Sequence, residues 1–210
     1  RQVATQLGGF LSALHSTPPE AVQGVGLPSV NPPRLRDSQH ALYARVQRYA
    51  FPLMSTEEQR WTQGLFELFL ADTANWQFRP VLVHGDFDSS NILCDPDSGR
   101  VVGIIDFEEA CPSDPALDFC VLKAEYGSGF LQDLLEAYHR LLDECFIQRV
   151  RFHSRRILFH EMLYGIRENA QPFVDHGLAR LRRAMTGLEP IGGWLAASTS
   201  ETRSREGYPA

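Results

Sequence analysis

The 210-residue sequence lacks several features that would assign it to a familiar class of protein. It contains no apolar run of the roughly 18–20 residues that a membrane-spanning helix needs, and no secretory signal pattern opens it. Its four cysteines form no CxxC pair, so neither a zinc site nor a disulfide framework is indicated. We therefore expect a protein of the reducing cytoplasm that has no membrane partner.

Lysine is almost absent, because Lys123 is the only lysine among 20 basic residues. The net charge of −6 argues against a general nucleic-acid binder, which would need a basic face, and is consistent with a cationic small-molecule substrate. An initiator methionine is also lacking, since the chain begins at Arg1 inside an apparent helix. Together these absences suggest a fragment whose N-terminal part is missing.

The spacing of apolar residues predicts a mostly helical domain. Gly8 weakens the first expected helix, so that helix should depend on tertiary packing. Ser55 and Glu58 form a possible capping box for another helix, whose buried face should carry Trp61, Leu65, Leu68 and Phe69. The first of these helices covers 3–16, and the remaining expected helices cover 38–49, about 131–147, about 150–169 and about 175–187. We expect one lobe over residues 1–197 and a polar, flexible tail over 198–210.

A small β-ribbon interrupts the helical pattern. The turn signal Asp95-Pro-Asp-Ser-Gly99 separates two apolar runs, so Asn91–Cys94 and Arg100–Ile105 should form a hairpin. One strand of this ribbon leads directly into Asp106, and an earlier apolar run, Val81–Val83, leads toward Asp86. An unpaired charge next to a buried strand is costly, so both carboxylates call for a partner.

The order and spacing of three polar residues indicate which partner that is. Asn91 follows Asp86 by five positions and Asp106 follows Asn91 by fifteen, as in a kinase-type catalytic loop and its metal-binding Asp. Mg²⁺ prefers one or two carboxylates together with phosphates and water, and Asn91 and Asp106 from the two arms of one hairpin could meet such an ion. Asp86 is placed to accept the proton of an attacking hydroxyl.

The segment "HGDFDSSNIL…GIIDFEEACPSDPALDF" resembles the aminoglycoside phosphotransferase family. That family carries HGDxxxxN, a strand ending in IDF or IDW, and a DPxxD segment, all present here, and "LGGFLSALHS" resembles the helix that opens its C-terminal lobe. The resemblance covers the chain from Arg1 to about Phe119. It implies an α+β, mostly helical, kinase-like C-terminal lobe with a small β-hairpin that carries the catalytic loop and the metal-binding Asp.

The resemblance also implies roles for individual residues. Asp86 would be the catalytic base, and Asn91 and Asp106 would hold Mg²⁺, with Ser90 beside them at the nucleotide. Asp118 would support the catalytic loop through hydrogen bonds, and His84 would pack beneath it. Protein kinases carry a basic residue two positions after the catalytic Asp, where this chain has an Asp. This difference favours a small-molecule kinase.

Kinase-like folds bind the nucleotide between two lobes, with a Gly-rich loop and a lysine on the smaller lobe. No lysine precedes residue 81, and Lys123 lies after the metal-binding Asp. We therefore expect that the N-terminal nucleotide lobe is absent from this chain and that nucleotide binding requires it. The C-terminal lobe alone should then be inactive.

The expected function is Mg²⁺-dependent transfer of a phosphoryl group from ATP or GTP to a hydroxyl of a small molecule. The family favours an aminoglycoside-like substrate and thus antibiotic resistance, while choline, homoserine, macrolide and sugar kinases share the motif. A non-catalytic binding module is the alternative from another class. Acidic residues could contact a cationic substrate, or could equally be solvated or paired with arginines: Asp88, Glu108, Glu161 and Glu168.

Overall fold

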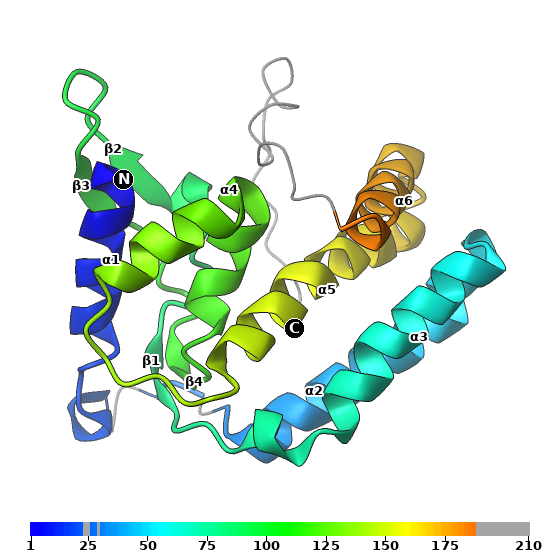
Figure 1. Cartoon of the computed structure of the whole chain (residues 1–210), viewed down its shortest axis with the longest axis horizontal. Coiled ribbons are helices and arrows are strands. Elements are labelled where there is room, and N and C mark those ends of the chain that lie inside the picture. Colours follow the sequence, from blue (N-terminus) through cyan, green and yellow to red (C-terminus); the bar gives the residue numbers. More distant parts are fainter. Residues whose placement is uncertain (23–25, 29, 188–210) are drawn as a thin grey trace.

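The computed structural model, which describes residues 1–22, 26–28 and 30–187, consists mostly of helices together with two very small sheets, one of which projects from the edge of the molecule (Figure 1). The expected tail, 198–210, lies outside the described residues. The mostly helical α+β prediction is confirmed. None of the described helices is both long and apolar enough to cross a membrane. The main helices are α1 (Gln2–Leu14), α2 (Pro32–Arg45), α3 (Thr56–Ala71), α4 (Leu117–Glu136), α5 (Phe146–Arg167) and α6 (Gln171–Met185).

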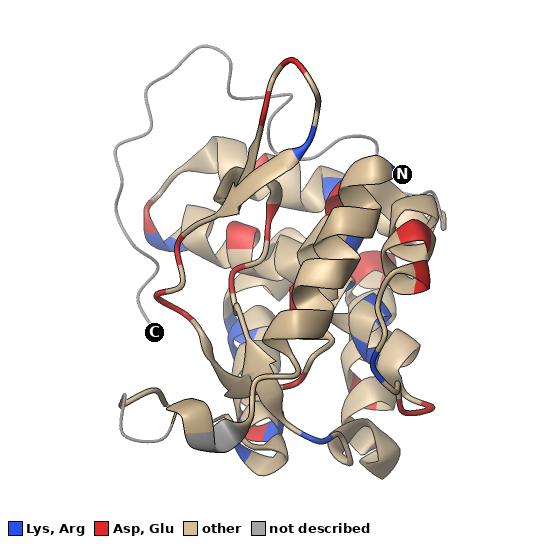
Figure 2. Ribbon diagram, turned by 90° about the vertical axis from the view of Figure 1, so that its left-hand side faces the viewer, with Lys and Arg blue, Asp and Glu red and all other residues tan. Residues whose placement is uncertain are grey.

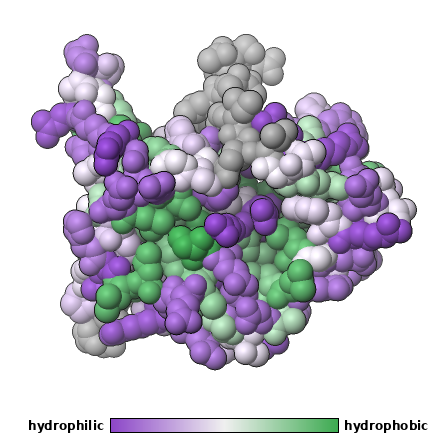
Figure 3. All heavy atoms as spheres, viewed as in Figure 1, coloured by the Kyte–Doolittle hydropathy of each residue, from purple (hydrophilic) through white to green (hydrophobic). Residues whose placement is uncertain are grey.

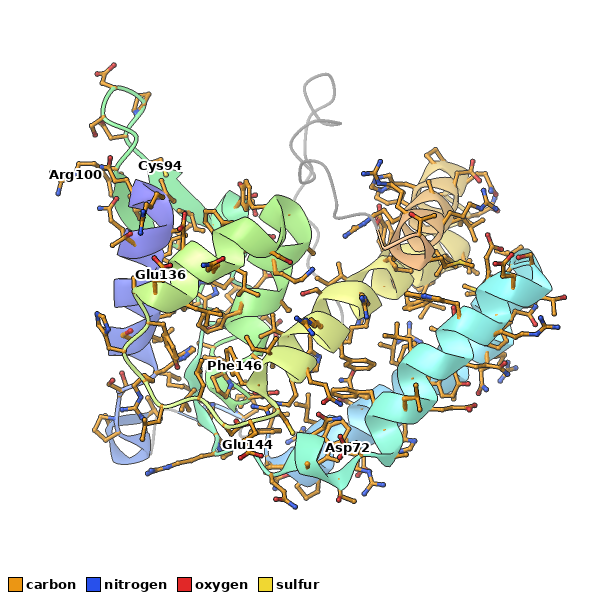
Figure 4. The ribbon with its side chains drawn as sticks, viewed as in Figure 1. Asp72, Cys94, Arg100, Glu136, Glu144 and Phe146 are labelled. Carbon is orange, nitrogen blue, oxygen red and sulfur yellow. The ribbon has the colours of Figure 1, made fainter. Side chains whose placement is uncertain are left out.

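Two hydrophobic cores hold these helices together, and α5 belongs to both. One core lies among α2, α3, α5 and α6, where the rings of Phe69 and Phe152 stack with centroids 3.6 Å apart. The other lies between α1, α4 and the first turn of α5, where Phe146 meets Phe119 edge to face at 5.1 Å (Figure 4). Hydrophobic residues also reach the surface in the central part of the face seen in Figure 3, between hydrophilic margins.

The sheets are two separate antiparallel pairs. β1 (Val81–Val83) pairs with β4 (Cys111–Ser113), and β2 (Ile92–Cys94) pairs with β3 (Val101–Ile104). The second pair confirms the predicted hairpin, whose connecting turn is closed by the hydrogen bond from the Ser98 amide to Asp95 Oδ1 at 2.7 Å. Cys94 and Arg100 mark the point where this turn leaves the strands (Figure 4).

Close packing explains why a glycine lies inside the first helix. A side chain at Gly8 would place its Cβ 2.4 Å from the carbonyl oxygen of Leu134 on α4. A contact this short leaves no space for any other residue, so the backbones of α1 and α4 can approach only because this position has no side chain. The tertiary contact thus outweighs the low helix propensity of glycine.

The helix predicted over 131–147 is wrong. α4 already begins at Leu117 and ends at Glu136, residues 137–145 are not helical, and α5 starts at Phe146. The first half of α4 escaped prediction because Gly127 lies inside it with φ +83°, at a kink, and a glycine in that position reads as a break. Leu141 and Leu142, which lie inside the predicted range, have exposed side chains.

The expected buried face of α3 was wrong at one position. Leu68 is 77% exposed, whereas Phe66, which was not assigned to that face, is completely buried. The capping box at the start of α3 is confirmed by two reciprocal bonds between Ser55 and Glu58. The helix expected over 38–49 begins earlier, because the Asn31 side chain caps it and two prolines occupy its first turn.

Candidate active site

Two loops that follow short strands meet beside the hairpin. The loop after β1 carries Asp86 and ends in η5 (Ser89–Asn91), a 3-10 helix of one turn. β2 begins directly after η5. The Ile105 amide donates to the Asn91 carbonyl oxygen at 3.0 Å, which holds Asn91 beside the segment that leads to Asp106. Figure 2 shows acidic positions on the loops around the small sheets, on the face turned toward the viewer.

Asp86 and Asn91 are in direct contact. The carboxamide nitrogen of Asn91 donates to the Asp86 carbonyl oxygen at 2.9 Å and to Asp86 Oδ2 at 3.2 Å. Burial raises the pKa of Asp86, and the nearby charges of Asp88 and Asp106 raise it further, while the bond from Asn91 lowers it. The structure therefore brings the predicted base and the predicted metal ligands into one electrostatically coupled group.

His84 joins the two loops through both of its ring nitrogens. Nε2 lies 2.9 Å from the Ile105 carbonyl oxygen, and Nδ1 lies 3.4 Å from the Asp86 amide nitrogen. A carbonyl can only accept and an amide can only donate, so these contacts assign a proton to Nε2 and the acceptor role to Nδ1. The ring is completely buried and links the backbone at Asp86 to the residue that precedes Asp106.

Asp118, at the start of α4, holds the beginning of the catalytic loop. Its carboxylate accepts from the His84 amide at 2.8 Å and from the Gly85 amide at 3.0 Å. The ring Nε2 of His15 on α1 lies 3.0 Å from the same carboxylate. The Asp118 side chain is completely buried, and these donors compensate its loss of hydration.

Asp88 and Ser90 bond to each other. Asp88 Oδ1 accepts from the Ser90 amide at 2.7 Å and from the Ser90 hydroxyl at 2.6 Å, so this carboxylate caps η5. The Ser90 side chain donates to this cap in the structure, and Glu108 lies exposed in the turn after Asp106.

Glu161 and Glu168, the two candidate substrate residues on α5, both take part in ion pairs. Glu161 lies buried between α5 and α6, where His176 Nδ1 is 2.5 Å away and Arg180 is 3.2 Å away. Glu168, directly after α5, contacts its neighbour Arg167 at 2.5 Å. Pairing with arginine, the alternative noted for these residues, is what the structure shows.

One residue in contact with the catalytic loop was missed by sequence reasoning. Glu125 on α4 is only 5% exposed, and its Oε2 accepts from the Ser89 amide at 3.3 Å. Glu125 could have been found once α4 was recognised, because it follows Asp118 by seven positions and so lies near the same helix face. The kink at Gly127 hid that helix.

The donor atoms of the site fit Mg²⁺ that arrives with a nucleotide. The amide nitrogen of Asn91 is committed to Asp86, so its carboxamide oxygen is the remaining donor, and the carboxylate of Asp106 is exposed beside it. Among the described residues, no cluster of three or more His, Cys, Asp or Glu could hold a metal ion alone. Mg²⁺ needs only one or two protein oxygens when phosphates complete its shell.

A hollow of about 420 Å³ lies elsewhere, at the start of α2. Its lining comes from α2 and from Trp76, and includes no residue of the catalytic loop or hairpin. This hollow is therefore separate from the group around Asp86.

Replacing Gly85 with alanine should destabilise the protein more than the same change at Gly99. Both glycines have positive φ, +85° and +63°, which costs a residue with a side chain about 1–2 kcal/mol. Only at Gly85 would the new Cβ also lie 2.4 Å from a backbone oxygen, that of Glu109, whereas Gly99 faces open space. Urea unfolding of the two variants measures the difference. Equal losses of stability would show that the Glu109 contact does not constrain the loop.

Comparison with known proteins adds independent findings. A family model described as "Phosphotransferase enzyme family" matches residues 1–148. Viomycin phosphotransferase of Streptomyces vinaceus is 27% identical over 182 residues, which are 86% of this chain and 61% of that protein. The uncharacterized protein YcbJ of Bacillus subtilis (strain 168) is 30% identical over 132 residues, or 63% of this chain and 41% of that protein.

Solved structures show the same fold. The GDP complex of wild-type aminoglycoside 2′-phosphotransferase-IIIa matches with a TM-score of 0.77 and 25% identity, over 88% of this chain and 61% of that one. Macrolide 2′-phosphotransferase type I matches with a TM-score of 0.71 and 23% identity, over 86% and 59%. The chain thus spans about two fifths to three fifths of the length of these relatives.

Proposed function

Because the chain belongs to the phosphotransferase enzyme family, we propose that it is the catalytic lobe of a kinase that transfers the terminal phosphoryl group of ATP or GTP to a hydroxyl of a small molecule. The observation that carries this proposal is the contact of Asn91 with Asp86, together with the bridge through His84 to the segment before Asp106. An enzyme needs Asp86, Asn91 and Asp106 together, whereas a non-catalytic binding module could lose any of them.

Asp86 is proposed as the catalytic base. In the proposed reaction a substrate hydroxyl oxygen forms a bond to the terminal phosphorus, the bond from that phosphorus to the nucleoside diphosphate breaks, and the hydroxyl proton passes to a carboxylate oxygen of Asp86. Asn91 and Asp106 would hold Mg²⁺, which when bound offsets the negative charge of the phosphates. Asn91 also donates to Asp86 Oδ2, so it orients the base.

The β2–β3 hairpin has exposed apolar residues that a nucleotide could cover. Leu93, Val102 and Ile105, in and next to the hairpin, are 44%, 67% and 42% exposed, so large apolar side chains lie uncovered near the polar site. We propose that the nucleotide base covers this surface and that a further lobe completes the pocket. This lobe would supply the phosphate-binding loop and the phosphate-pairing lysine, since no lysine precedes residue 81 in this sequence. Residues 1–210 alone are then expected to be inactive.

The proposed substrate is a cationic small molecule of the antibiotic type, and the proposed location is the cytoplasm. Relatives named for viomycin and aminoglycoside phosphotransferase activity support this class, as do the acidic Asp88, whose charge acts on Asp86, and Glu108, exposed in the turn after Asp106. Ser90 is proposed to lie near the phosphates.

The test is a transfer assay of the complete protein with Mg²⁺ and either ATP or GTP. The panel contains aminoglycosides, viomycin-type cyclic peptides, macrolides and amino alcohols, and mass spectrometry detects the added phosphoryl group. We expect phosphorylation of at least one amine-bearing member, and a comparison of the two nucleotides identifies the donor. If the protein binds nucleotide but modifies no member of the panel, the non-catalytic binding module becomes the better account.

A further inference from the structure

The first half of α4 contacts the catalytic loop at two places. Asp118, in its first turn, accepts from the backbone of His84 and Gly85. Glu125, seven residues later, accepts from the backbone of Ser89. Seven residues are about two helical turns, or about 10.5 Å along the axis. The loop that carries Asp86 is therefore held from the same helix face at both of its ends.

The contact of Glu125 with the loop places a carboxylate where its charge is unfavourable. Its side chain is buried, and the amide of Ser89 donates to its Oε2 at 3.3 Å. Burial raises the pKa of Glu125, and the charge of Asp88 raises it further, while the bonds from Ser89 lower it. Ser89 is thus the loop residue to which Glu125 bonds.

The path of α4 changes directly after this contact. Gly127 has φ +83°, a conformation that residues with a side chain rarely adopt. The second half of the helix then packs against α1, where the Leu134 carbonyl lies against Gly8. The kink therefore lets one helix serve both the catalytic loop and the core beside α1.

Every backbone amide of η5 has an acceptor, and only one of these acceptors comes from outside the loop. The Ser90 amide donates to the Asp88 side chain, and the Asn91 amide donates to the Asp88 carbonyl oxygen at 3.3 Å. The Ser89 amide donates to Glu125. Because η5 ends at Asn91, whose side chain contacts Asp86, a shift of this turn would move both functional groups.

We propose that Glu125 is a positioning residue that anchors η5 to α4 and thereby fixes the orientation of Asn91 and Asp86. Glu125 acts on them through its bond to the Ser89 amide. The inference rests on the proposed phosphotransfer for its effect on rate, but the anchoring itself can be measured without turnover.

The variants change this hydrogen bond from both sides. Glu125→Ala removes the acceptor, whereas Glu125→Gln keeps an oxygen that can accept the same bond. Ser89→Pro removes the donor, and proline is tolerated there because Ser89 opens the turn after the extended Asp88. Ser89→Ala removes only the hydroxyl. Glu136→Ala, at an exposed site on the same helix, is the control.

In the complete protein we expect Glu125→Ala and Ser89→Pro each to lower kcat roughly tenfold, as the loss of one buried hydrogen bond would, with smaller changes in KM. Glu125→Gln and Ser89→Ala should stay within about threefold of the wild type, and Glu136→Ala should be unchanged. The positioning role is wrong if Glu125→Gln lowers kcat as much as Glu125→Ala does. It is also wrong if Ser89→Pro lowers kcat no more than Ser89→Ala does.

Hydrogen exchange gives the readout that does not depend on turnover. Amides of the peptide over 87–94 should exchange faster in Glu125→Ala and Ser89→Pro than in the other three variants, while a peptide from the centre of α5 stays unchanged. An unchanged 87–94 peptide in both variants would overturn the inference. If the wild type transfers no phosphoryl group, the proposed function fails, and exchange still decides whether Glu125 anchors the loop.

Discussion

Replacing Asp86 with alanine in the complete protein is expected to abolish phosphoryl transfer while the fold is retained. A positioned general base contributes roughly 10²–10⁴-fold to a rate, and alanine leaves no group that could take the hydroxyl proton. The fold should persist because the carboxylate of Asp86 is not needed for stability: burial and the neighbouring Asp88 and Asp106 raise its pKa, so its charge is held at a cost. Steady-state kinetics and urea unfolding measure the two effects.

Asp97→Ala is the matched control for this substitution. Asp97 lies exposed in the turn between β2 and β3, close in sequence to the catalytic loop but outside its hydrogen bonds. The control should keep the activity of the wild type. Retained turnover in Asp86→Ala would remove the role that we propose for Asp86, and a matching loss in Asp97→Ala would point to a general effect on the lobe.

Replacing Arg149 with methionine is expected to cause the largest loss of stability. Arg149 is completely buried, its Nε donates to Asp114 at 2.8 Å, and its two terminal nitrogens donate to Asp143 at 2.7 Å each. Removing one partner of a buried ion pair leaves an uncompensated charge and typically costs about 3–5 kcal/mol. Methionine keeps most of the volume, so the measured change in the free energy of unfolding should reflect charge and hydrogen bonds rather than a cavity.

Two further variants separate this effect from a general disturbance of α5. Arg151→Met, at an exposed position on the same helix, should change the free energy of unfolding by less than about 0.5 kcal/mol. Adding Asp114→Asn to Arg149→Met should recover part of the loss, because the buried carboxylate is then neutral. A loss below about 1 kcal/mol in Arg149→Met would show that water reaches this group.

The ion pair of Arg149 with Asp143 predicts that the stability of the protein depends on pH. Hydrogen bonds from Arg149 lower the pKa of Asp143 below its ordinary value. A carboxylate whose pKa is lower in the folded state stabilises the fold above its unfolded pKa, about 3.9, and this contribution disappears as pH falls through the folded value. Wild-type unfolding curves recorded from pH 6 downward should show this loss, and the part due to Asp143 should be missing in Arg149→Met.

Local patterns were informative wherever the structure depends on neighbours in sequence. The hairpin between β2 and β3 was predicted because its turn residues are consecutive, and the cap of α3 because Ser55 and Glu58 are three positions apart. The resemblance to the aminoglycoside phosphotransferase family, which rests on motifs within residues 84–118, is confirmed by the family match. The roles of Asp86, Asn91 and Asp106 stay predictions, although the fold brings these residues together.

Contacts between distant segments were not predictable in the same way. Arg149 pairs with Asp114 across 35 positions, Glu125 bonds to Ser89 across 36, and His15 reaches Asp118 across 103. No spacing rule marks such pairs, since they depend on how helices pack. Similarly, Leu68 and Phe66 are both apolar, and only the packing of α2 and α5 against α3 decides that Phe66 is the buried one.

By itself the sequence determined the local structure of the loop and hairpin and which polar groups they carry. Turns, caps and short spacings are set by steric and hydrogen-bonding preferences of adjacent residues. Only the tertiary structure decided what holds that chemistry in place. The His84 bridge and the two contacts from α4 exist because a polar group buried in a packed core needs a hydrogen-bond partner, and that partner can lie anywhere along the chain.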